Sequence, residues 1–574
     1  MGMGECPSVY PFPLSPLPMD PQAQASHALA LFHSGSIEQA LQAALDLIPV
    51  PTVAAEMEHL AAACLYQLGR AQEAITHVRK AILLDGANSG YINTYGVVLR
   101  KLKRTAQAIR SYERVMALQP NFSDVYYNCG NALQELKRSD EAAERFRVCI
   151  KLNPRHHSAH HNLANVLRDL RQLDDAIKHY SISAEIEDNN PDMHCNWGLA
   201  WQLQERWDKA IDCFEKAICQ KADHAPSHIN LGGALSVQER FEEACVVLRR
   251  GVELDDSCND AKFNLGLTLL TIGQFEEGWK FYDTRLRLPD KVRPPLPTPI
   301  WDGDLTIKEP LLVWCEQGYG DNIQFARYLP ILMEHGLSIT CSMRPALMDL
   351  FRHCLRPACP PLIEHKPSEL QGFKYHVPLL SLPRICRTSL VTVPMMPGYL
   401  QVSEPVPDRL RVSRRPFALH IGMVWASGVD NKDMYADKSL SLDKLMPIFD
   451  SWRNDRLVVI HSLQVGVDAS QLDPWREGRG VVDWSTKLES FFDTAIVISQ
   501  LDFVITVDTA VAHVAGSLNK PTWTLLQHNA DFRWLRGRSD TPWYPQMSLI
   551  RQTKLGDWAS VVDQVQERLT LLLG

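Results

Sequence analysis

The chain has 574 residues, enough for about three or four domains, and its 45% hydrophobic and 22% charged residues are ordinary for a globular protein. A formal net charge of −8 argues against a nucleic-acid-binding protein, which usually presents a basic face. The 14 cysteines form no C-x-x-C pair, so neither a zinc ribbon nor a disulfide framework is indicated. No apolar run approaches the length needed to span a membrane.

Residues 1–22 are rich in proline and lack the basic and then apolar layout of a secretory signal. We therefore expect a disordered leader and a cytoplasmic protein.

The next 260 or so residues carry small side chains at a fixed spacing of 34 positions. Two helix backbones can approach closely only across a small side chain, so two such series indicate stacked helix pairs. This period is that of the tetratricopeptide repeat, and we expect about eight units over residues 23–285, stacked into an α superhelix. The first series is Ala62, Gly96, Gly130, Ala164, Gly198, Gly232 and Gly266; the second is Ala40, Ala74, Ala108, Ala142, Ala176, Ala210, Ala244 and Gly278.

Asparagine recurs at one repeat position that helix packing does not explain. One row is Asn128, Asn162, Asn196, Asn230 and Asn264, and a second row on the same helical face contains Asn131 and Asn165. A side-chain amide both donates and accepts, so a ladder of amides can hold the backbone of an extended peptide. We predict an acceptor groove for a polypeptide here; the alternative is that these side chains bridge neighbouring helices. The ladder resembles that of the nucleocytoplasmic O-GlcNAc transferases.

Four histidines, His156, His157, His160 and His161, lie at one repeat turn and the start of the next helix. Their spacing would allow metal pairs, but no acidic or cysteine residue accompanies them, so we expect solvated or groove-lining side chains and no metal site.

After residue 285 the repeat pattern stops, and a proline-rich linker is predicted over residues 286–309. Short apolar strands then alternate with helices, which indicates parallel sheets built from βαβ units. We expect two Rossmann-like halves, 310–410 on the acceptor side and 411–574 on the donor side. The predicted strands are 311–315, 338–341, 418–425, 457–463, 503–507 and 522–526, with helices around 322–335 and 488–500.

Two segments carry candidate chemistry. In the first, a strand leads into a Gly-Tyr-Gly-Asp turn, where Gly318 and Gly320 allow a close backbone approach to a ligand and Asp321 lies at the carboxyl end of the strand. In the second, a strand ends at Asp508 and Thr509 and a helix starts at once, with His513 one turn in. The unpaired amides of that helix start form an anion site.

These segments read GYGDNIQFARYLPIL and VDTAVAHVAGSLNKPTW, and they are similar to the glycosyltransferase family that contains the lipopolysaccharide heptosyltransferases. The resemblance extends through Ser462-Leu-Gln464, Asp531-Phe-Arg-Trp534 and Pro542-Trp-Tyr-Pro545, which look like the bacterial subgroup fused to tetratricopeptide repeats. Some repeat-fused relatives modify flagellin. The resemblance implies a GT-B fold, a nucleotide-sugar donor held mainly by the C-terminal half, and inverting transfer without a metal or other cofactor.

The resemblance also implies roles for individual residues. Asp321 matches the general base, and Asp508, Thr509 and His513 match the segment that holds the phosphate and ribose of the donor. Lys438, followed by Ser439, falls where a cation neutralises the leaving phosphate; the subgroup more often has Arg there. The loop over residues 427–438 departs from the family pattern. Gln464 and Trp425 are looser candidates for nucleotide contacts.

The sequence thus favours a glycosyltransferase that modifies a Ser or Thr hydroxyl of a polypeptide held by the repeats. Two alternatives stay open: the same chemistry on lipopolysaccharide or another surface glycan, and a repeat scaffold whose transferase domain is inactive.

Overall fold

The computed structural model describes residues 20–573 apart from 290–295, 297, 317, 365, 367–369, 371, 404, 429–437, 455–456 and 476–480. Most of the predicted leader and of the loop before Lys438 therefore lies outside the described residues. The chain divides into two compact units, residues 1–227 and 228–574, and each is described on its own. Within the described residues, no helix is both long enough and apolar enough to cross a bilayer.

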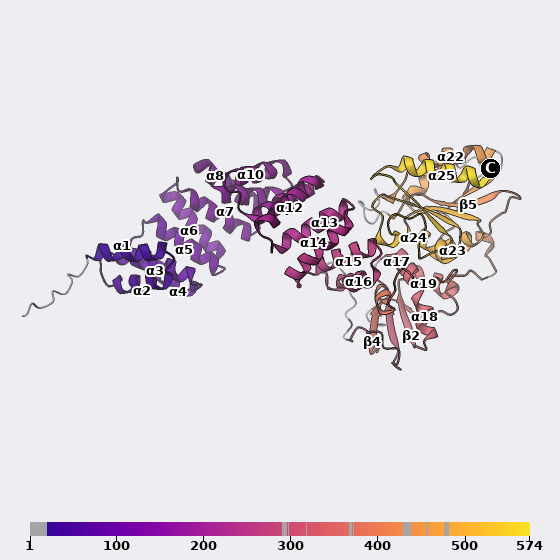
Figure 1. The fold of residues 1–574 in the computed structure, drawn as a ribbon, viewed down its shortest axis with the longest axis horizontal. Helices are drawn as coiled ribbons and strands as arrows, with labels where there is room; N and C mark the ends of the chain where they lie inside the picture. The colour runs from indigo at the N-terminus through magenta and orange to yellow at the C-terminus, as the bar shows by residue number, and fades with distance from the viewer. Residues whose placement is uncertain are drawn as a thin grey trace, which may run out of the picture. The chain divides into compact units, whose positions relative to one another are not determined.

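The first unit consists of consecutive helices joined by short turns (Figure 1). One residue in the turn inside each helix pair has a positive φ, which ends the first helix sharply. These turn residues keep the 34-residue period: Gly35, Gly69, Lys103, Lys137, Arg171 and Glu205. The helices are α1 (Pro21–His33), α2 (Ile37–Leu47), α3 (Ala54–Gln67), α4 (Ala71–Leu84), α5 (Ser89–Lys101), α6 (Thr105–Leu118), α7 (Ser123–Glu135), α8 (Ser139–Leu152), α9 (His157–Asp169), α10 (Leu173–Ile186), α11 (Pro191–Leu203) and α12 (Trp207–Gln220).

The small residues of the first series lie where the two helices of a pair touch. A Cβ atom added to Gly130 would lie 2.5 Å from the ring of Phe146, and one added to Gly96 would lie 2.5 Å from the ring of Tyr112. Both rings are fully buried, so neither can move aside without cost. The predicted close approach of paired helices is confirmed.

The second unit begins within α13 (Ala225–Val237) and continues the helix pairs with α14 (Phe241–Leu254), α15 (Asn259–Thr271), α16 (Phe275–Tyr282) and the 3₁₀ turn η1 (Asp283–Arg287). Side chains of this last pair, among them Phe275, Trp279 and Tyr282, belong to the same hydrophobic core as the α/β region that follows. The last repeat and the α/β region therefore share one core.

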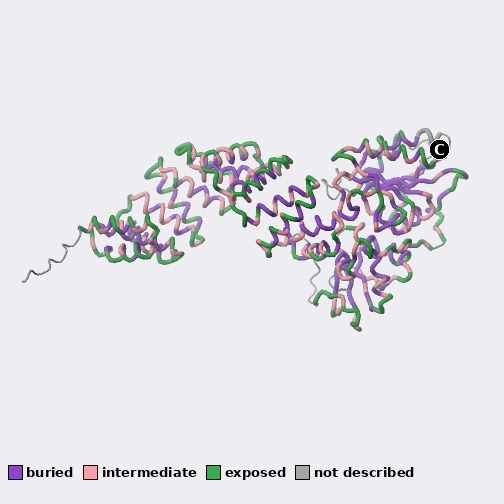
Figure 2. The backbone as a smooth tube through the Cα atoms, in the orientation of Figure 1, coloured by how far each residue is buried: buried purple, intermediate pink, exposed green. Residues whose placement is uncertain are grey.

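The α/β region contains two sheets whose ladders are all parallel. One has the strand order β3-β2-β1-β4 and the other β10-β9-β8-β5-β6-β7. Figure 2 shows the central strands as buried stretches. The strands are β1 (Leu311–Trp314), β2 (Ile339–Met343), β3 (Leu362–Glu364), β4 (Tyr375–Pro378), β5 (Leu419–Val424), β6 (Val458–Ser462), β7 (Val481–Asp483), β8 (Phe503–Val507), β9 (Thr522–Leu526) and β10 (Met547–Arg551).

The helices of this region follow the strands, as the predicted alternation requires. They are α17 (Tyr319–Phe325), α18 (Tyr328–Glu334), α19 (Pro345–Cys354), α20 (Leu382–Ile385), α22 (Leu442–Asn454), α23 (Phe491–Ser499), α24 (Ala510–Ser517) and α25 (Trp558–Leu573), with short 3₁₀ turns η2 (Leu379–Ser381), η3 (Asp408–Leu410), η4 (Val467–Trp475) and η5 (Phe532–Trp534). The prediction of a single helix over 322–335 is wrong, because two helices, α17 and α18, cover this segment. The break lies at Arg327, a fully buried side chain that donates to the Gln324 and Trp543 carbonyls.

Candidate functional site

The two sequence segments that carry candidate chemistry meet at one cavity of about 250 Å³. Helix α17, which follows β1 of the first sheet, packs against α24, which follows β8 of the second sheet (Figure 1). The carboxyl ends of parallel strands are where open α/β sheets bind ligands. The cavity is lined by Gly318, Gly320, Asp321, Lys438, Asp508, Thr509, Ala510, His513, Asp531 and Arg533.

The two glycines of the first segment have different structural roles. Gly318 precedes α17 with a φ of +97°, a conformation that side chains other than glycine rarely adopt. Gly320 allows α17 to approach α24, because a Cβ atom there would lie 2.6 Å from Cδ2 of His513. Both glycines line the cavity, as their predicted ligand contact requires, and Gly320 also sets the distance between the two helices.

Asp321 lies in the first turn of α17 and forms an ion pair with Arg533, at 2.8 Å. The same guanidinium pairs with Asp531 at 2.5 Å. Burial raises the pKa of the Asp321 carboxyl above its ordinary value, and the charge of Arg533 opposes that rise. The Asp321 side chain is still 27% exposed, so a molecule in the cavity can reach it. Sequence reasoning missed Arg533 and Asp531 as site residues, although their Asp-Phe-Arg-Trp motif was noted.

A second ion pair lies beside the start of α24, on the side of the cavity formed by the second sheet. Lys438 Nζ is 2.6 Å from Asp508 Oδ2. Burial alone would raise the pKa of Asp508, but the ammonium of Lys438 holds it below its ordinary value. Thr509 is the N-cap residue of α24, and its hydroxyl lies 3.2 Å from that of Thr506. Each lysine or arginine that lines the cavity is therefore already paired with a carboxylate.

His513 is held in the wall of the cavity. Its Nδ1 lies 3.0 Å from the Tyr544 hydroxyl, and its ring stacks on Trp534 with 5.2 Å between centroids. Burial lowers the pKa of His513 to about 3, so the imidazole is neutral at physiological pH. A neutral ring can accept or donate a hydrogen bond but cannot neutralise a phosphate.

Three residues that the sequence associated with the donor do not line this cavity. Ser439 accepts a hydrogen bond from the Ser427 backbone N–H at 3.1 Å. Gln464 is buried, and its carbonyl oxygen accepts from the N–H groups of Trp425 and Ala426. Trp425 is fully buried in the core beside the second sheet. Ser439 and Gln464 are hydrogen-bonded to the backbone just after β5, and Trp425 is buried in the core. These contacts explain why the three side chains do not reach the cavity.

The last repeat contacts both segments that supply the Asp321–Arg533 pair. Arg285 of η1, only 4% exposed, donates to both carboxylate oxygens of Glu316 at 2.9 and 2.7 Å, in the loop that leads to Asp321. Trp279 and Tyr282 pack on Phe532, the neighbour of Arg533, with ring centroids 5.8 and 5.5 Å apart.

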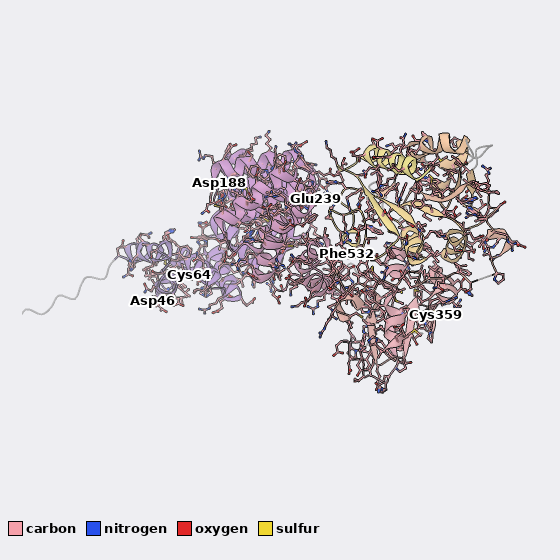
Figure 3. The ribbon with its side chains drawn as sticks, turned by 45° about the vertical axis from the view of Figure 1, so that its right-hand side comes forward. Asp46, Cys64, Asp188, Glu239, Cys359 and Phe532 are labelled. Atoms are coloured by element: carbon pink, nitrogen blue, oxygen red, sulfur yellow. The ribbon has the colours of Figure 1, made fainter. Side chains whose placement is uncertain are left out.

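A further link joins the turn before α14 to residues that follow β9. Glu239 Oε1 lies 3.1 Å from His528 Nε2 and 3.0 Å from Arg536 Nη1. Glu239 and Phe532 are labelled in Figure 3. Glu239 has a positive φ of 59°, like the charged residues at the same turn position of the preceding repeats. The last helices of the repeat array therefore contact the segments around the cavity through both ion pairs and aromatic packing.

The predicted asparagine ladder is half-buried along its whole length. Three of its members, Asn128, Asn162 and Asn196, donate to side chains of the preceding repeat. Asn165 instead accepts from the Tyr180 hydroxyl at 2.6 Å. The bridging bonds join Asn128 Nδ2 to Asn93 Oδ1 (3.1 Å), Asn162 Nδ2 to Asn131 Oδ1 (2.7 Å) and Asn196 Nδ2 to His161 Nε2 (3.4 Å). Asn230 and Asn264 occupy the equivalent positions in α13 and α15.

The four clustered histidines make separate contacts. His157 pairs with Glu187 at 3.1 Å, and His160 lies 2.9 Å from His179. His156 accepts from the Ala159 backbone N–H, which caps α9. Burial lowers the pKa of His161 to about 4. Across the described part of the chain, no set of three or more His, Cys, Asp or Glu side chains is placed to hold a metal ion.

Comparison with known proteins identifies the helical part. Residues 96–137 match the family model described as TPR repeat, and residues 127–193 match the one described as tetratricopeptide repeat. Protein FlbA of Caulobacter vibrioides is 24% identical over 347 residues, which are 54% of this chain and 54% of that protein. The chain thus spans about half the length of this curated relative.

Solved structures of repeat proteins also align with the chain. YrrB, described as a TPR protein with an unusual peptide-binding site, is 20% identical over 32% of this chain and 95% of its own, with a TM-score of 0.29. PilF of Pseudomonas aeruginosa is 18% identical over 37% of this chain and 96% of its own, with a TM-score of 0.34. The family matches and the observed helix pairs together identify the helical part of the chain as an array of tetratricopeptide repeats.

Proposed function

We propose that the α/β region is a glycosyltransferase of GT-B type, which moves a sugar from a nucleotide-sugar donor to a hydroxyl group of a protein bound by the repeats. The observation that carries the proposal is the convergence of Asp321 with Asp508, Thr509 and His513 on one cavity. These residues were selected from sequence because they resemble one family of transferases. Their meeting from two separate parallel sheets is what a donor and acceptor cleft requires.

In the proposed reaction, Asp321 takes the proton of the acceptor hydroxyl as its oxygen attacks the anomeric carbon of the sugar. The bond from that carbon to the donor phosphate breaks, and the nucleotide leaves with its phosphate. The positive charge of Arg533 favours the carboxylate form of Asp321 and opposes the burial that raises the pKa of this group. Lys438 and the start of α24 at Thr509 would stabilise the charge of the leaving phosphate.

The acceptor is proposed to be a protein because repeat arrays of this kind present extended surfaces to protein partners. The half-buried ladder amides support this in part. Each side-chain amide has two N–H donors and a carbonyl, and the bridging bond of Asn128 uses one N–H, whereas Asn162 donates to both Asn131 and Tyr127.

A second candidate function is a repeat scaffold with an inactive α/β region, and the charge of the cavity favours it. Three carboxylates, Asp321, Asp508 and Asp531, face only two cations, Lys438 and Arg533, among the described residues that line the cavity. A nucleotide sugar carries negative charge, so it must displace one of these pairings in order to bind.

Intact mass spectrometry of co-purifying proteins tests the proposal. Cells would express the full chain as wild type or as Asp321→Asn, which removes the base and keeps the shape of the side chain. A partner protein is expected to carry discrete sugar-sized mass increments with the wild type and to lose them with the variant. Asp540→Asn is the matched control, because Asp540 is an exposed carboxylate paired with Arg538 and does not line the cavity.

Retention of the increments with Asp321→Asn at wild-type level would refute the role of Asp321. Unchanged masses in every partner, together with altered surface glycans, would move the acceptor from protein to glycan. Unchanged partners and unchanged glycans would favour the scaffold.

A further inference from the structure

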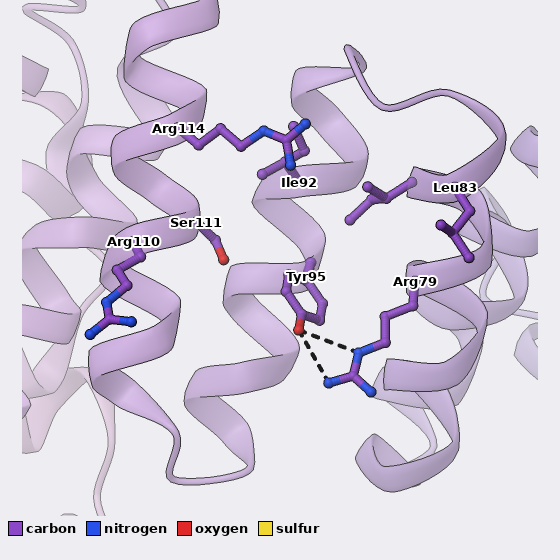
Figure 4. A pocket seen from close by; sticks show the side chains of 8 residues that line it. Arg79, Leu83, Ile92, Tyr95, Arg110, Ser111 and Arg114 are labelled. Atoms are coloured by element: carbon purple, nitrogen blue, oxygen red, sulfur yellow. Dashed lines mark hydrogen bonds between the residues drawn. The ribbon is translucent and has the colours of Figure 1, made fainter.

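A hollow of about 380 Å³ lies between α4, α5 and α6 of the first unit (Figure 4). Its apolar part is formed by Ile82, Leu83 and Ile92. Ile92 is almost fully buried, whereas Leu83 is 84% exposed on the rim. An exposed leucine beside an apolar floor is a feature of surfaces that receive another molecule.

Three arginines surround this apolar floor, and their hydrogen bonds go to neutral groups. Arg79 donates to the Tyr95 hydroxyl at 3.3 Å, as Figure 4 shows, and Arg114 donates to the Gly86 carbonyl at 2.7 Å. Arg110 makes no hydrogen bond or ion pair within the described part of the chain. Arg110 and Arg114 stand one helical turn apart, where like charges destabilise a helix.

Several other arginines of the array pair with carboxylates. Three of them use the same local pairing with a glutamate three residues later: Arg70 with Glu73, Arg138 with Glu141 and Arg240 with Glu243. The hydrogen bonds of Arg79 and Arg114 go instead to a hydroxyl and a carbonyl, so the arginines around the hollow supply a local positive field on a chain of net charge −8.

Repeat packing does not explain these arginines either. One repeat later, 34 positions along the chain, the three arginines are replaced by Glu113, Glu144 and Val148. Positions needed for packing keep their chemistry from repeat to repeat, as the small residues do. Basic residues recur at these positions, such as Arg147 two repeats after Arg79, but all three positions are basic only at this hollow, which two neighbouring repeats form.

We propose that this hollow binds an acidic segment of a partner protein, in which carboxylates flank an apolar side chain. The apolar side chain would lie against Ile82, Leu83 and Ile92, and the carboxylates would pair with Arg110 and Arg114. A bidentate guanidinium–carboxylate pair suits this geometry. The apolar floor distinguishes a peptide from a nucleic acid, whose backbone would leave that floor unused. This inference does not depend on transferase activity.

Fluorescence anisotropy with the full chain tests the proposal. The probe is a labelled twelve-residue peptide with glutamates on both sides of leucines, and its counterpart has lysine at each glutamate. Wild type is expected to bind only the acidic peptide, and more weakly as NaCl is raised. Arg110→Glu should weaken binding about tenfold, since it exchanges an attraction for a repulsion.

Arg147→Glu is the matched control, because Arg147 is also an exposed arginine on the second helix of a repeat and lies outside the hollow. It should bind the acidic peptide within about twofold of wild type, well short of the tenfold loss expected for Arg110→Glu. Leu83→Ser should weaken binding without changing the salt dependence. Equal binding by wild type and Arg110→Glu, or no binding by wild type, would overturn the proposal. Tighter binding of a labelled oligonucleotide that Arg110→Glu abolishes would overturn it in favour of a nucleic acid.

Discussion

Two adjacent glycines in α13 provide a direct test of the packing that builds the repeats. A Cβ atom on Gly232 would lie 2.3 Å from Cγ of Leu248, which is fully buried, whereas one on Gly233 would meet no atom within 4 Å. Both replacements by alanine gain about 1 kcal/mol of helix propensity. Gly232→Ala alone adds the cost of overpacking, about 1–3 kcal/mol. The difference between the two variants therefore isolates the packing cost and should be about 1–3 kcal/mol.

Hydrogen exchange of the amides in residues 225–254 of the full chain measures this difference, because local opening is better defined than global unfolding in a chain of several domains. Exchange should be slower in Gly233→Ala than in wild type. It should be faster in Gly232→Ala than in Gly233→Ala. Adding Leu248→Val to Gly232→Ala should recover part of the loss, since it removes a methyl group from the crowded contact. Equal exchange in the two single variants would refute the reasoning that small residues set the helix spacing.

Three other variants test the site and the turns. Arg285→Met should destabilise the loop before Asp321 by about 3–5 kcal/mol, because it leaves Glu316 without its buried partner. Thermal unfolding measures this loss, with Arg287→Met at an exposed position as the control. Arg533→Met should raise the pKa of Asp321, because burial already raises it and the variant removes the positive charge that opposes this rise. The pH below which kcat/KM declines should therefore move upward by about 1 pH unit or more. If this pH does not move, Asp321 is not the titrating base. Lys137→Gly should stabilise the first unit by about 1 kcal/mol in urea unfolding, since its φ of 59° suits glycine, and a loss of stability would contradict that reading.

The repeats and the central strands could be predicted because each leaves a local pattern in the sequence. The repeats show small residues every 34 positions, and the strands show short apolar runs. The strand at 503–507 and that at 522–526 are observed as β8 (Phe503–Val507) and β9 (Thr522–Leu526). The outer strands β3, β4, β7 and β10 were not predicted. β3 and β7 are three residues long and half-buried, so their hydrophobic signal is short and weak. The division between α17 and α18 also escaped prediction, since it depends on a carbonyl of distant Trp543.

Candidate site residues were predictable where a strand end and a helix start coincide, as at Asp321 and Asp508. Their partners were not, because an ion pair such as Asp321–Arg533 depends on how two separate sheets approach each other. The asparagine ladder shows a related limit. Periodicity indicates that Asn128 and Asn162 share an environment, but only the positions of neighbouring helices show that each bridges to the preceding repeat.

The charge balance of the cavity gives a prediction that separates an enzyme from a scaffold. Asp321 has a raised pKa, and its protonation on lowering the pH removes one negative charge from the cavity and leaves Arg533 paired with Asp531 alone. Binding of a nucleotide should therefore tighten as the pH falls through the pKa of Asp321, while transfer, which needs the ionised base, declines. Asp321→Asn should bind the nucleotide more tightly than wild type at neutral pH and lose its pH dependence, yet remain inactive. Isothermal titration calorimetry with a panel of nucleoside mono- and diphosphates measures this, and Asp540→Asn should match wild type. Weaker binding by Asp321→Asn would contradict the electrostatic argument, and a chain that binds no nucleotide in either form would be a scaffold.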